Sequence, residues 1–228
     1  MQRFFTCEHA GNSVPDEFRL LFAGHEAVLE THRGYDIGAF QVAFRIAREV
    51  SAPLFHSMVT RLLVDLNRST HHRSLFSEFS RVLDEAHRED VLRRFYFPYR
   101  RNVENAIGQF ISEGCPVLHV SVHSFVPELN GRVRNADVGL LYDPARATEV
   151  AWCAAMRALL RHWTPELRVR RNYPYLGTAD GFTTHLRKLW PNSQYAGIEL
   201  EINQRILADP RDAQVLTDDL LQAILEIR

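Results

Sequence analysis

Residues 3–15 read RFFTCEHAGNSVP, and the interpretation of the whole chain starts from this stretch. An apolar run typical of a buried strand leads directly into Glu8 and His9, and a sharp turn is favoured from Gly11 onward. In α/β proteins the loops that follow strands carry ligand-binding and catalytic side chains. The stretch therefore predicts a first strand that ends at a functional site, with an ordinary surface turn as the alternative.

The overall composition favours a single globular domain over residues 1–228. With 46% hydrophobic residues the chain can bury a sizeable core, and its formal net charge of −1 indicates neither a nucleic-acid partner nor a membrane surface. The three cysteines lie far apart without a C-x-x-C pair, which predicts free thiols in a reducing compartment. No apolar run approaches the ~20 residues of a membrane span, and no signal segment is recognisable, so we expect a cytoplasmic protein.

Short apolar runs alternate with longer amphipathic stretches along the chain. This alternation predicts helices on both faces of a mainly parallel or mixed sheet. Pro98 further predicts an irregular start for the helix that contains it. The predicted strands are 2–7, 53–58, 60–65, 117–122, 138–142, 167–171 and 195–202, and the predicted helices are 16–31, 36–50, 78–90, 95–113, 146–163, 179–189 and 210–226.

Four of the predicted strands end in polar clusters. Because ligands bind beyond the carboxyl ends of strands in such sheets, these clusters are expected to contribute to one shared site. They are TCEHAGN (6–12), LLVDLNRS (62–69), LHVSVHSF (118–125) and GIELEINQ (197–204).

His9 and His123 follow two of these strands and are the candidate metal-binding histidines. Histidines and carboxylates are the usual ligands of a catalytic zinc, which takes three protein groups and leaves one position open. His119 lies about 13 Å from His123 along an extended strand, so the two cannot bind one ion. We therefore expect His119 to be a hydrogen-bonded core residue.

A third ligand must be a carboxylate, and Asp36 and Glu8 are both candidates. Asp36 lies in THRGYDIGA (31–39), where it is followed by a predicted helix. It therefore has an alternative role as a residue that caps the helix start. The sequence leaves the choice between the two carboxylates open.

Glu199 and Glu201 are two carboxylates on one side of an apolar strand, about 6.6 Å apart. Burying such groups is costly unless they are paired or functional. One of them is suited to take a proton from an attacking water and deliver it to a leaving amine. The other is suited to pair with an arginine, which is also the purely structural interpretation of both.

Several basic side chains accompany the predicted site. Asn67 and Arg68 match the geometry of a carboxylate, because an arginine fork binds such a group through two hydrogen bonds. Arg61 and Arg134 are candidates to stabilise a developing oxyanion, with Arg134 preferred. Solvated surface arginines remain the alternative in so arginine-rich a chain.

These residues lie in an ordered set of motifs that resembles the N-formylglutamate amidohydrolase family. Single motifs are weakly specific, but the ordered set is highly specific and covers nearly the whole chain. The motifs are CEHAGNSVP (7–15), HRGYDIGA (32–39), TRLLVDLNRS (60–69), YFPYRRNVENAI (96–107), VHSFVPELNGRVRNADVGLLYD (122–143), NYPYLGTADGFT (172–183) and IELEINQRIL (198–207).

The resemblance implies a three-layer α/β/α fold with a mixed central sheet, similar to zinc carboxypeptidases and aspartoacylases. It further implies zinc-dependent hydrolysis of an N-acyl amino acid, the model reaction converting N-formyl-L-glutamate and water to formate and L-glutamate. By the same resemblance His9 and His123 bind zinc, and Glu201 is the base.

The remaining site residues also have counterparts in the family. Glu199 supports Glu201, Asn67 and Arg68 hold the substrate carboxylate, and Arg134 follows the HSF loop. In the aspartoacylase pattern a glutamate stands three residues after the first histidine, and Asn12 occupies that place here. The third ligand therefore stays open between Asp36 and Glu8.

Three other functions remain open on sequence grounds. The first is an N-acyl-amino-acid or small-peptide hydrolase of different specificity on the same site. The second is a non-catalytic protein that retains the carboxylate pocket. The third is a serine or cysteine hydrolase, which lacks support because no G-x-S-x-G motif is present.

Overall fold

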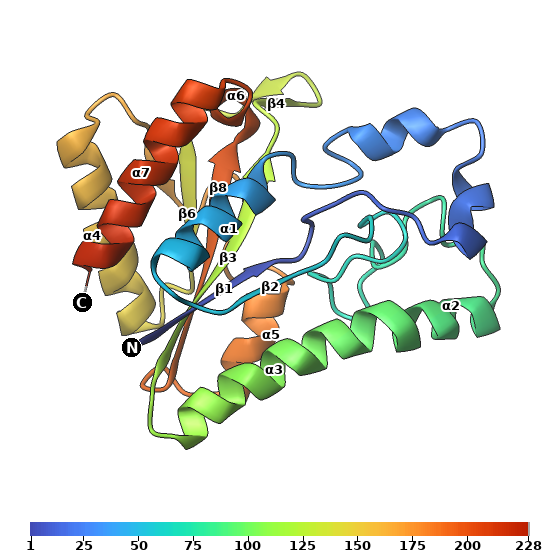
Figure 1. The fold of residues 1–228 in the computed structure, drawn as a ribbon, viewed down its shortest axis with the longest axis horizontal. Coiled ribbons are helices and arrows are strands. Elements are labelled where there is room, and N and C mark those ends of the chain that lie inside the picture. Colours follow the sequence, from blue (N-terminus) through green and yellow to red (C-terminus); the bar gives the residue numbers. More distant parts are fainter. Residues whose placement is uncertain (228) are drawn as a thin grey trace.

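The computed structural model describes residues 1–227 and is built around a six-stranded mixed sheet (Figure 1). In spatial order its strands are β2 (Leu54–His56), β1 (Gln2–Cys7), β3 (Val117–Phe125), β8 (Tyr195–Asn203), β6 (Val138–Leu141) and β7 (Val169–Arg171). The first four are parallel, β6 runs antiparallel to β8, and β7 is parallel to β6. The carboxyl ends of β1, β3 and β8 therefore meet at one edge of the sheet.

Helices cover both faces of this sheet. Figure 1 shows α1 (Ala39–Glu49), α4 (Ala147–Trp163) and α7 (Pro210–Glu226) on one side, and their buried side chains form the larger apolar core with the sheet. On the other side, α3 (Phe97–Ser112) and α5 (Phe182–Leu189) form a second core with β1, β3 and β8. The predicted three-layer α/β/α architecture with a mixed sheet is confirmed.

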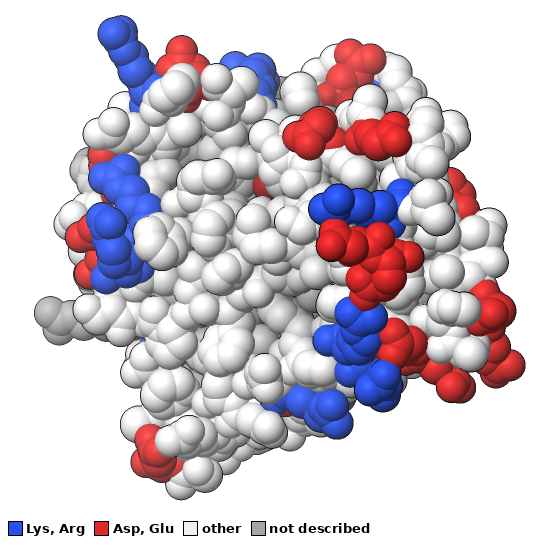
Figure 2. All heavy atoms as spheres, turned by 45° about the vertical axis from the view of Figure 1, so that its right-hand side comes forward, with Lys and Arg blue, Asp and Glu red and all other residues white. Residues whose placement is uncertain are grey.

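Residues 12–35 and 58–96 form a lobe beside the sheet, at the right of Figure 1. A third apolar cluster holds it together, with Phe18, Leu63 and Tyr96 among its buried members. The lobe contains two short 3-10 helices (Asp16–Phe22 and Glu26–Glu30), α2 (Glu85–Val91) and a π-helical turn (Leu92–Tyr96) that runs into α3. On the face in Figure 2, acidic and basic side chains alternate over this lobe rather than forming a patch of one sign.

The strand predicted at 60–65 is wrong. Its apolar side chains are buried, but they belong to the core of the lobe, and the backbone makes successive turns. Arg61 and Asp65 form an ion pair of 2.8 Å, whereas four residues of extended chain would separate them by about 13 Å. The run is apolar because it fills the core of the lobe, and it pairs with no strand of the sheet.

Two predicted helices are shorter than expected. The stretch 16–31 divides into the two 3-10 helices because Gly24, at a φ of +75°, turns the chain between them. Within 78–90, only α2 from Glu85 onward is α-helical, and the Asp84 side chain caps it by accepting from the His87 N–H. In the lobe, side-chain packing determines the backbone conformation, and the helical periodicity of the sequence does not.

The other predicted helices and strands are confirmed, apart from shifts at their ends. The π-helical turn before Pro98 provides the irregular start predicted for α3. Strand β3 extends to Phe125, so His123 lies within the strand instead of after it. None of the helices formed by residues 1–227 is both long and apolar enough to cross a membrane.

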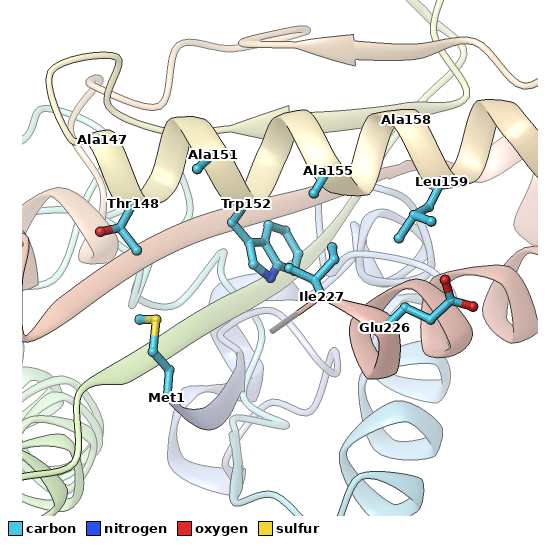
Figure 3. Close-up of a pocket in the computed structure, with 10 residues that line it drawn as sticks. All are labelled: Met1, Ala147, Thr148, Ala151, Trp152, Ala155, Ala158, Leu159, Glu226 and Ile227. Atoms are coloured by element: carbon cyan, nitrogen blue, oxygen red, sulfur yellow. The ribbon is translucent and has the colours of Figure 1, made fainter.

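An apolar groove of about 960 Å³ lies along α4, far from the carboxyl ends of the strands (Figure 3). Ala151, Ala155 and other small side chains of α4 form one wall, and Met1 and Ile227 lie opposite them. Since Met1 precedes β1 and His9 follows it, the groove is separate from the site described below.

Candidate functional site

A small cavity of about 140 Å³ opens where β1, β3 and β8 end and the lobe meets the sheet. It brings together every predicted site residue except Arg134 and Glu8, the alternative metal ligand. Its lining consists of His9, Asp36, Arg61, Asn67, Arg68, His123, Ser124, Tyr175, Leu176, Ala179, Asp180, Glu199 and Glu201. Three of the four polar clusters lie at the carboxyl ends of sheet strands, as predicted. The cluster at 62–69 reaches the cavity from a turn of the lobe.

His9, His123 and Asp36 meet at the floor of this cavity and are all buried. The two imidazole rings lie 5.2 Å apart between centroids, although 114 positions separate the residues in the chain. Asp36 Oδ2 is 2.7 Å from Nδ1 of His123 and 3.3 Å from Nδ1 of His9. The Asp36 N–H donates to the His9 carbonyl at 3.0 Å, which fixes the loop that carries the carboxylate.

Glu8, the other candidate ligand, lies behind His123 rather than between the histidines. Its Oε2 accepts a hydrogen bond of 2.6 Å from Ser121 Oγ and lies 3.3 Å from Nε2 of His123. Glu8 therefore contacts the ring nitrogen on the far side from Asp36. The geometry favours Asp36 as the carboxylate of the cluster.

Each histidine has a second polar partner that orients its ring. His9 Nε2 is 2.8 Å from Asp65 Oδ1, and His123 Nε2 is 2.8 Å from Ser121 Oγ. Arg61 donates to both Asp36 and Asp65, at 3.2 and 2.8 Å. Such outer partners fix the orientation of metal-binding imidazoles and make them more basic.

The electrostatic environment keeps these groups charged in the metal-free protein. Burial alone would raise the pKa of Asp36, but the neighbouring His9, His123 and Arg61 hold it well below its usual range. Burial likewise opposes charge on His123, yet hydrogen bonds to Asp36 and Glu8 raise the pKa of its ring well above normal. The cluster is thus a set of tightly paired polar groups rather than an apolar core.

One donor atom from each of His9, Asp36 and His123 lies within 4.8 Å of the others. Two imidazole nitrogens and one carboxylate oxygen are the donor set of catalytic zinc sites, in which a fourth position stays open for water or substrate. The chemistry and spacing of these groups fit a divalent metal ion.

Glu201 projects into the same cavity from β8, directly across from His123 in the sheet register. It is 6% exposed, and its Oε2 has no hydrogen-bond partner among the residues that the structure describes. Burial, assisted by the nearby charges of Asp36 and Glu199, raises the pKa of Glu201 to about 7. A carboxyl group in this state can both accept and donate a proton near neutral pH.

Glu199 lies two residues earlier on the same side of β8, as predicted. Its Oε1 accepts a hydrogen bond of 2.8 Å from Thr183 Oγ1 at the start of α5. Glu199 therefore has a structural partner, whereas Glu201 keeps a free oxygen. This difference separates the two carboxylates, which only the family resemblance distinguished in the sequence.

Asn67 and Arg68 are held in the cavity wall by the segment before α5. The Asn67 Oδ1 accepts from the Phe182 N–H at 2.6 Å, so the Asn67 amide group is left as a donor. Arg68 donates from one guanidinium nitrogen to the Asp180 carbonyl at 2.6 Å. The pair presents N–H donors on one side of the cavity, a pattern suited to an anionic group.

Arg134 lies outside the cavity lining. Its guanidinium stacks on the ring of Tyr175 at 5.0 Å and on Phe125 at 5.9 Å. Because Tyr175 lines the cavity and is 45% exposed, Arg134 lies at the cavity mouth.

The structure also settles the role of His119 and adds residues that sequence reasoning missed. His119 bonds to Thr6 Oγ1 and Tyr195 OH, both at 2.7 Å, as a buried core residue. Asp65 and Tyr175 had no predicted role, although both lie in the family motifs. Their contacts depend on chain segments far away in sequence, so only the motif positions could have pointed to them.

Comparison with known proteins agrees with this architecture. The family model for N-formylglutamate amidohydrolase matches residues 2–208. The crystal structure of gene product Atu2144 from Agrobacterium tumefaciens is similar with a TM-score of 0.81 and 27% identity, covering 98% of this chain and 90% of that one. An N-formylglutamate amidohydrolase from Ralstonia eutropha JMP134 shares the fold, with a TM-score of 0.68 and 18% identity over 99% and 92% of the two chains. No curated protein sequence matches the chain. The extent of the family match, together with the fold, shows that the chain belongs to the N-formylglutamate amidohydrolase family.

Proposed function

We propose that this protein is a zinc-dependent amidohydrolase that cleaves the amide bond of an N-formyl or other N-acyl amino acid, such as N-formyl-L-glutamate. The observation that carries the proposal is the free, buried oxygen of Glu201 in the same small cavity as the cluster of His9, Asp36 and His123. Family membership supports the reaction class.

His9, Asp36 and His123 are the residues that would hold the zinc ion. When bound there, zinc supplies Lewis acidity to the acyl carbonyl and lowers the pKa of water. Asp65 and Ser121 keep the two rings oriented from behind, through the hydrogen bonds described above.

Glu201 is the proposed general base. Its free Oε2 accepts a proton from the attacking water, and the protonated carboxyl then donates that proton to the departing nitrogen. A pKa near 7 suits both steps, because neither protonation state is strongly favoured at neutral pH.

Asn67 and Arg68 are proposed to bind the α-carboxylate of the substrate. Glu199 is proposed to support this wall of the cavity, because it binds Thr183, the neighbour of the Phe182 that holds Asn67. Of the two arginines expected near the oxyanion, Arg61 lines the cavity and Arg134 does not. We therefore assign the oxyanion to Arg61 instead of Arg134.

Replacing the base tests this mechanism. Glu201→Gln should lower kcat for N-formyl-L-glutamate by at least about 100-fold while zinc content, measured by elemental analysis, stays unchanged. Glu128→Gln, an exposed change in the β4–β5 hairpin (Glu128–Leu129 and Arg132–Val133), is the matched control. Full activity in Glu201→Gln would exclude Glu201 as the base.

Metal removal and a substrate panel separate the remaining functions. Chelation should abolish turnover, and added zinc should restore it. The small cavity, below the ~300–1,000 Å³ of pockets for drug-sized ligands, favours N-formyl and N-acetyl amino acids over dipeptides. Turnover that survives chelation would indicate a serine or cysteine hydrolase, and absence of both zinc and turnover would indicate a binding protein.

A further inference from the structure

Arg134 is a positive charge at the cavity mouth that the proposed chemistry does not use. It directly follows the β4–β5 hairpin, and its backbone N–H donates to the Pro127 carbonyl at 2.7 Å. This bond closes the base of the hairpin and fixes where the side chain leaves the backbone. The side chain itself is half-buried.

Two aromatic rings hold the Arg134 guanidinium in place. It lies 5.0 Å from the centre of the Tyr175 ring and 5.9 Å from that of Phe125. No carboxylate within residues 1–227 forms an ion pair with it. Stacking leaves the edge of a guanidinium free, so its N–H donors remain available for a planar anionic group.

The other arginines of the site already have partners. Arg61 donates to Asp36 and Asp65, and Arg68 donates to the Asp180 carbonyl and is proposed to hold the α-carboxylate. Arg134 carries no such commitment and is stacked on a ring that lines the cavity, so it is available to a second carboxylate of the substrate.

The cavity volume places such a second carboxylate near the mouth. At about 30 Å³ for each water, a cavity of 140 Å³ holds about five water-sized groups, whereas N-formylglutamate has roughly a dozen non-hydrogen atoms. With the amide at the buried cluster and the α-carboxylate on Asn67 and Arg68, the end of a glutamate side chain would reach the rim of the cavity, where Tyr175 and Leu176 are the exposed lining residues. Leu176 is 63% exposed, which marks this side of the cavity as open.

The charge of Arg134 also acts on a neighbouring side chain. The pKa of His32 is lowered first by partial burial and then by the positive charges of Arg33, Arg134 and Arg61. Asp36 acts on His32 in the opposite direction. The charge of Arg134 nevertheless reaches this ring, and an anionic group beside its guanidinium is stabilised.

We propose that Arg134 determines specificity by binding the side-chain carboxylate of an acidic N-acyl amino acid, with Tyr175 holding its guanidinium at the cavity mouth. The inference depends on the proposed function and goes further, because it assigns a residue that selects the substrate side chain.

Two substrates of the same shape test this role. N-formyl-L-glutamate and N-formyl-L-glutamine differ only in the charge of the distal group. The zinc-loaded wild type should favour the glutamate substrate in kcat/KM by about 10- to 100-fold, the range expected for one hydrogen-bonded charge pair. Arg134→Gln should remove this preference by raising KM for the glutamate substrate, with kcat and the glutamine substrate little affected.

Arg132→Gln removes a more exposed charge from the same hairpin and should leave the preference unchanged. If Arg134→Gln keeps the wild-type preference, the role of Arg134 is wrong while the proposed function stands. A wild type without preference for the acidic substrate would also overturn it. If the wild type hydrolyses neither substrate, the proposed function itself fails, and the role of Arg134 fails with it.

Discussion

Glu201 and His119 lie on neighbouring strands, and burial shifts the pKa of each toward the neutral form. The two side chains nevertheless have different roles. Glu201 has a free oxygen in the cavity, and burial raises its pKa to about 7, where it can exchange a proton. Both ring nitrogens of His119 are hydrogen-bonded, to Thr6 and Tyr195, and burial lowers the pKa of the ring to about 4. Only the first residue combines a shifted pKa with access to a ligand, which distinguishes a functional group from a structural one.

His119 makes stability depend on pH. Its pKa is lower in the folded protein than the usual histidine value of 6.5, so folding favours the neutral ring. This contribution is complete above pH 6.5 and is lost as the pH falls toward 4, by about 3 kcal/mol in total. Urea unfolding of metal-free protein should therefore show a smaller loss of stability between pH 7 and 4.5 in His119→Gln than in wild type. Equal losses in both proteins would contradict the assignment.

At the scale of the elements, helix α3 supports the turn that carries Asn67 and Arg68. Arg100 is 6% exposed and donates from one nitrogen to the carbonyls of Leu66 and Arg68, each at 3.2 Å. Its guanidinium also stacks on Phe182, at 4.1 Å from the ring centre. The same arginine thus connects the lobe, α3 and the start of α5.

Arg100→Met should destabilise the fold by about 2–4 kcal/mol, because it leaves the buried Leu66 carbonyl without its donor. It should also raise KM for N-formyl-L-glutamate, because the turn that carries Arg68 loses its hydrogen bond from Arg100. Arg101→Met, at the exposed neighbouring position, is the control and should change neither value. Urea unfolding and steady-state kinetics measure the two effects, and unchanged stability in Arg100→Met would show that the contact is dispensable.

At the scale of the whole molecule, the candidate metal ligands come from three separate parts of the chain. His9 follows β1, Asp36 precedes α1, and His123 lies in β3. An ion bound by all three would connect the sheet to the loop that leaves the lobe. Because the unfolded chain does not hold these groups together, binding stabilises the folded state.

Zinc should therefore raise the Tm of metal-free protein. At a zinc concentration of 1,000 times Kd the gain is about 4 kcal/mol, or roughly 10 °C for a chain of this size. His9→Ala should abolish the shift, whereas His71→Ala, at an exposed position outside the cluster, should retain it. Calorimetry of the three proteins checks this, and an equal shift in His9→Ala would exclude the proposed metal site.

The central strands and the main helices could be predicted because local sequence pattern controls them. Strands β1, β3 and β8 are apolar runs of the length that a buried parallel sheet requires, and α4 and α7 show helical periodicity. The predicted strand at 60–65 failed because an apolar run reports burial but not the partner that buries it. Those side chains fill the lobe, where no strand is available for pairing.

For the site, the sequence by itself determined which residue types follow the strands, and from them the two histidines, the two glutamates and the Asn67–Arg68 pair. Only the tertiary structure shows that Asp36 rather than Glu8 lies between the histidines, that Glu201 rather than Glu199 keeps an oxygen without a partner, and that Arg61 rather than Arg134 lines the cavity. The physical reason is that ligation, burial and ion pairing depend on distances of a few ångströms between segments far apart in the chain. Strand and helix patterns constrain the backbone locally. They do not specify which carboxylate oxygen lies between the two histidine rings, or which carboxylate oxygen is left without a hydrogen-bond partner.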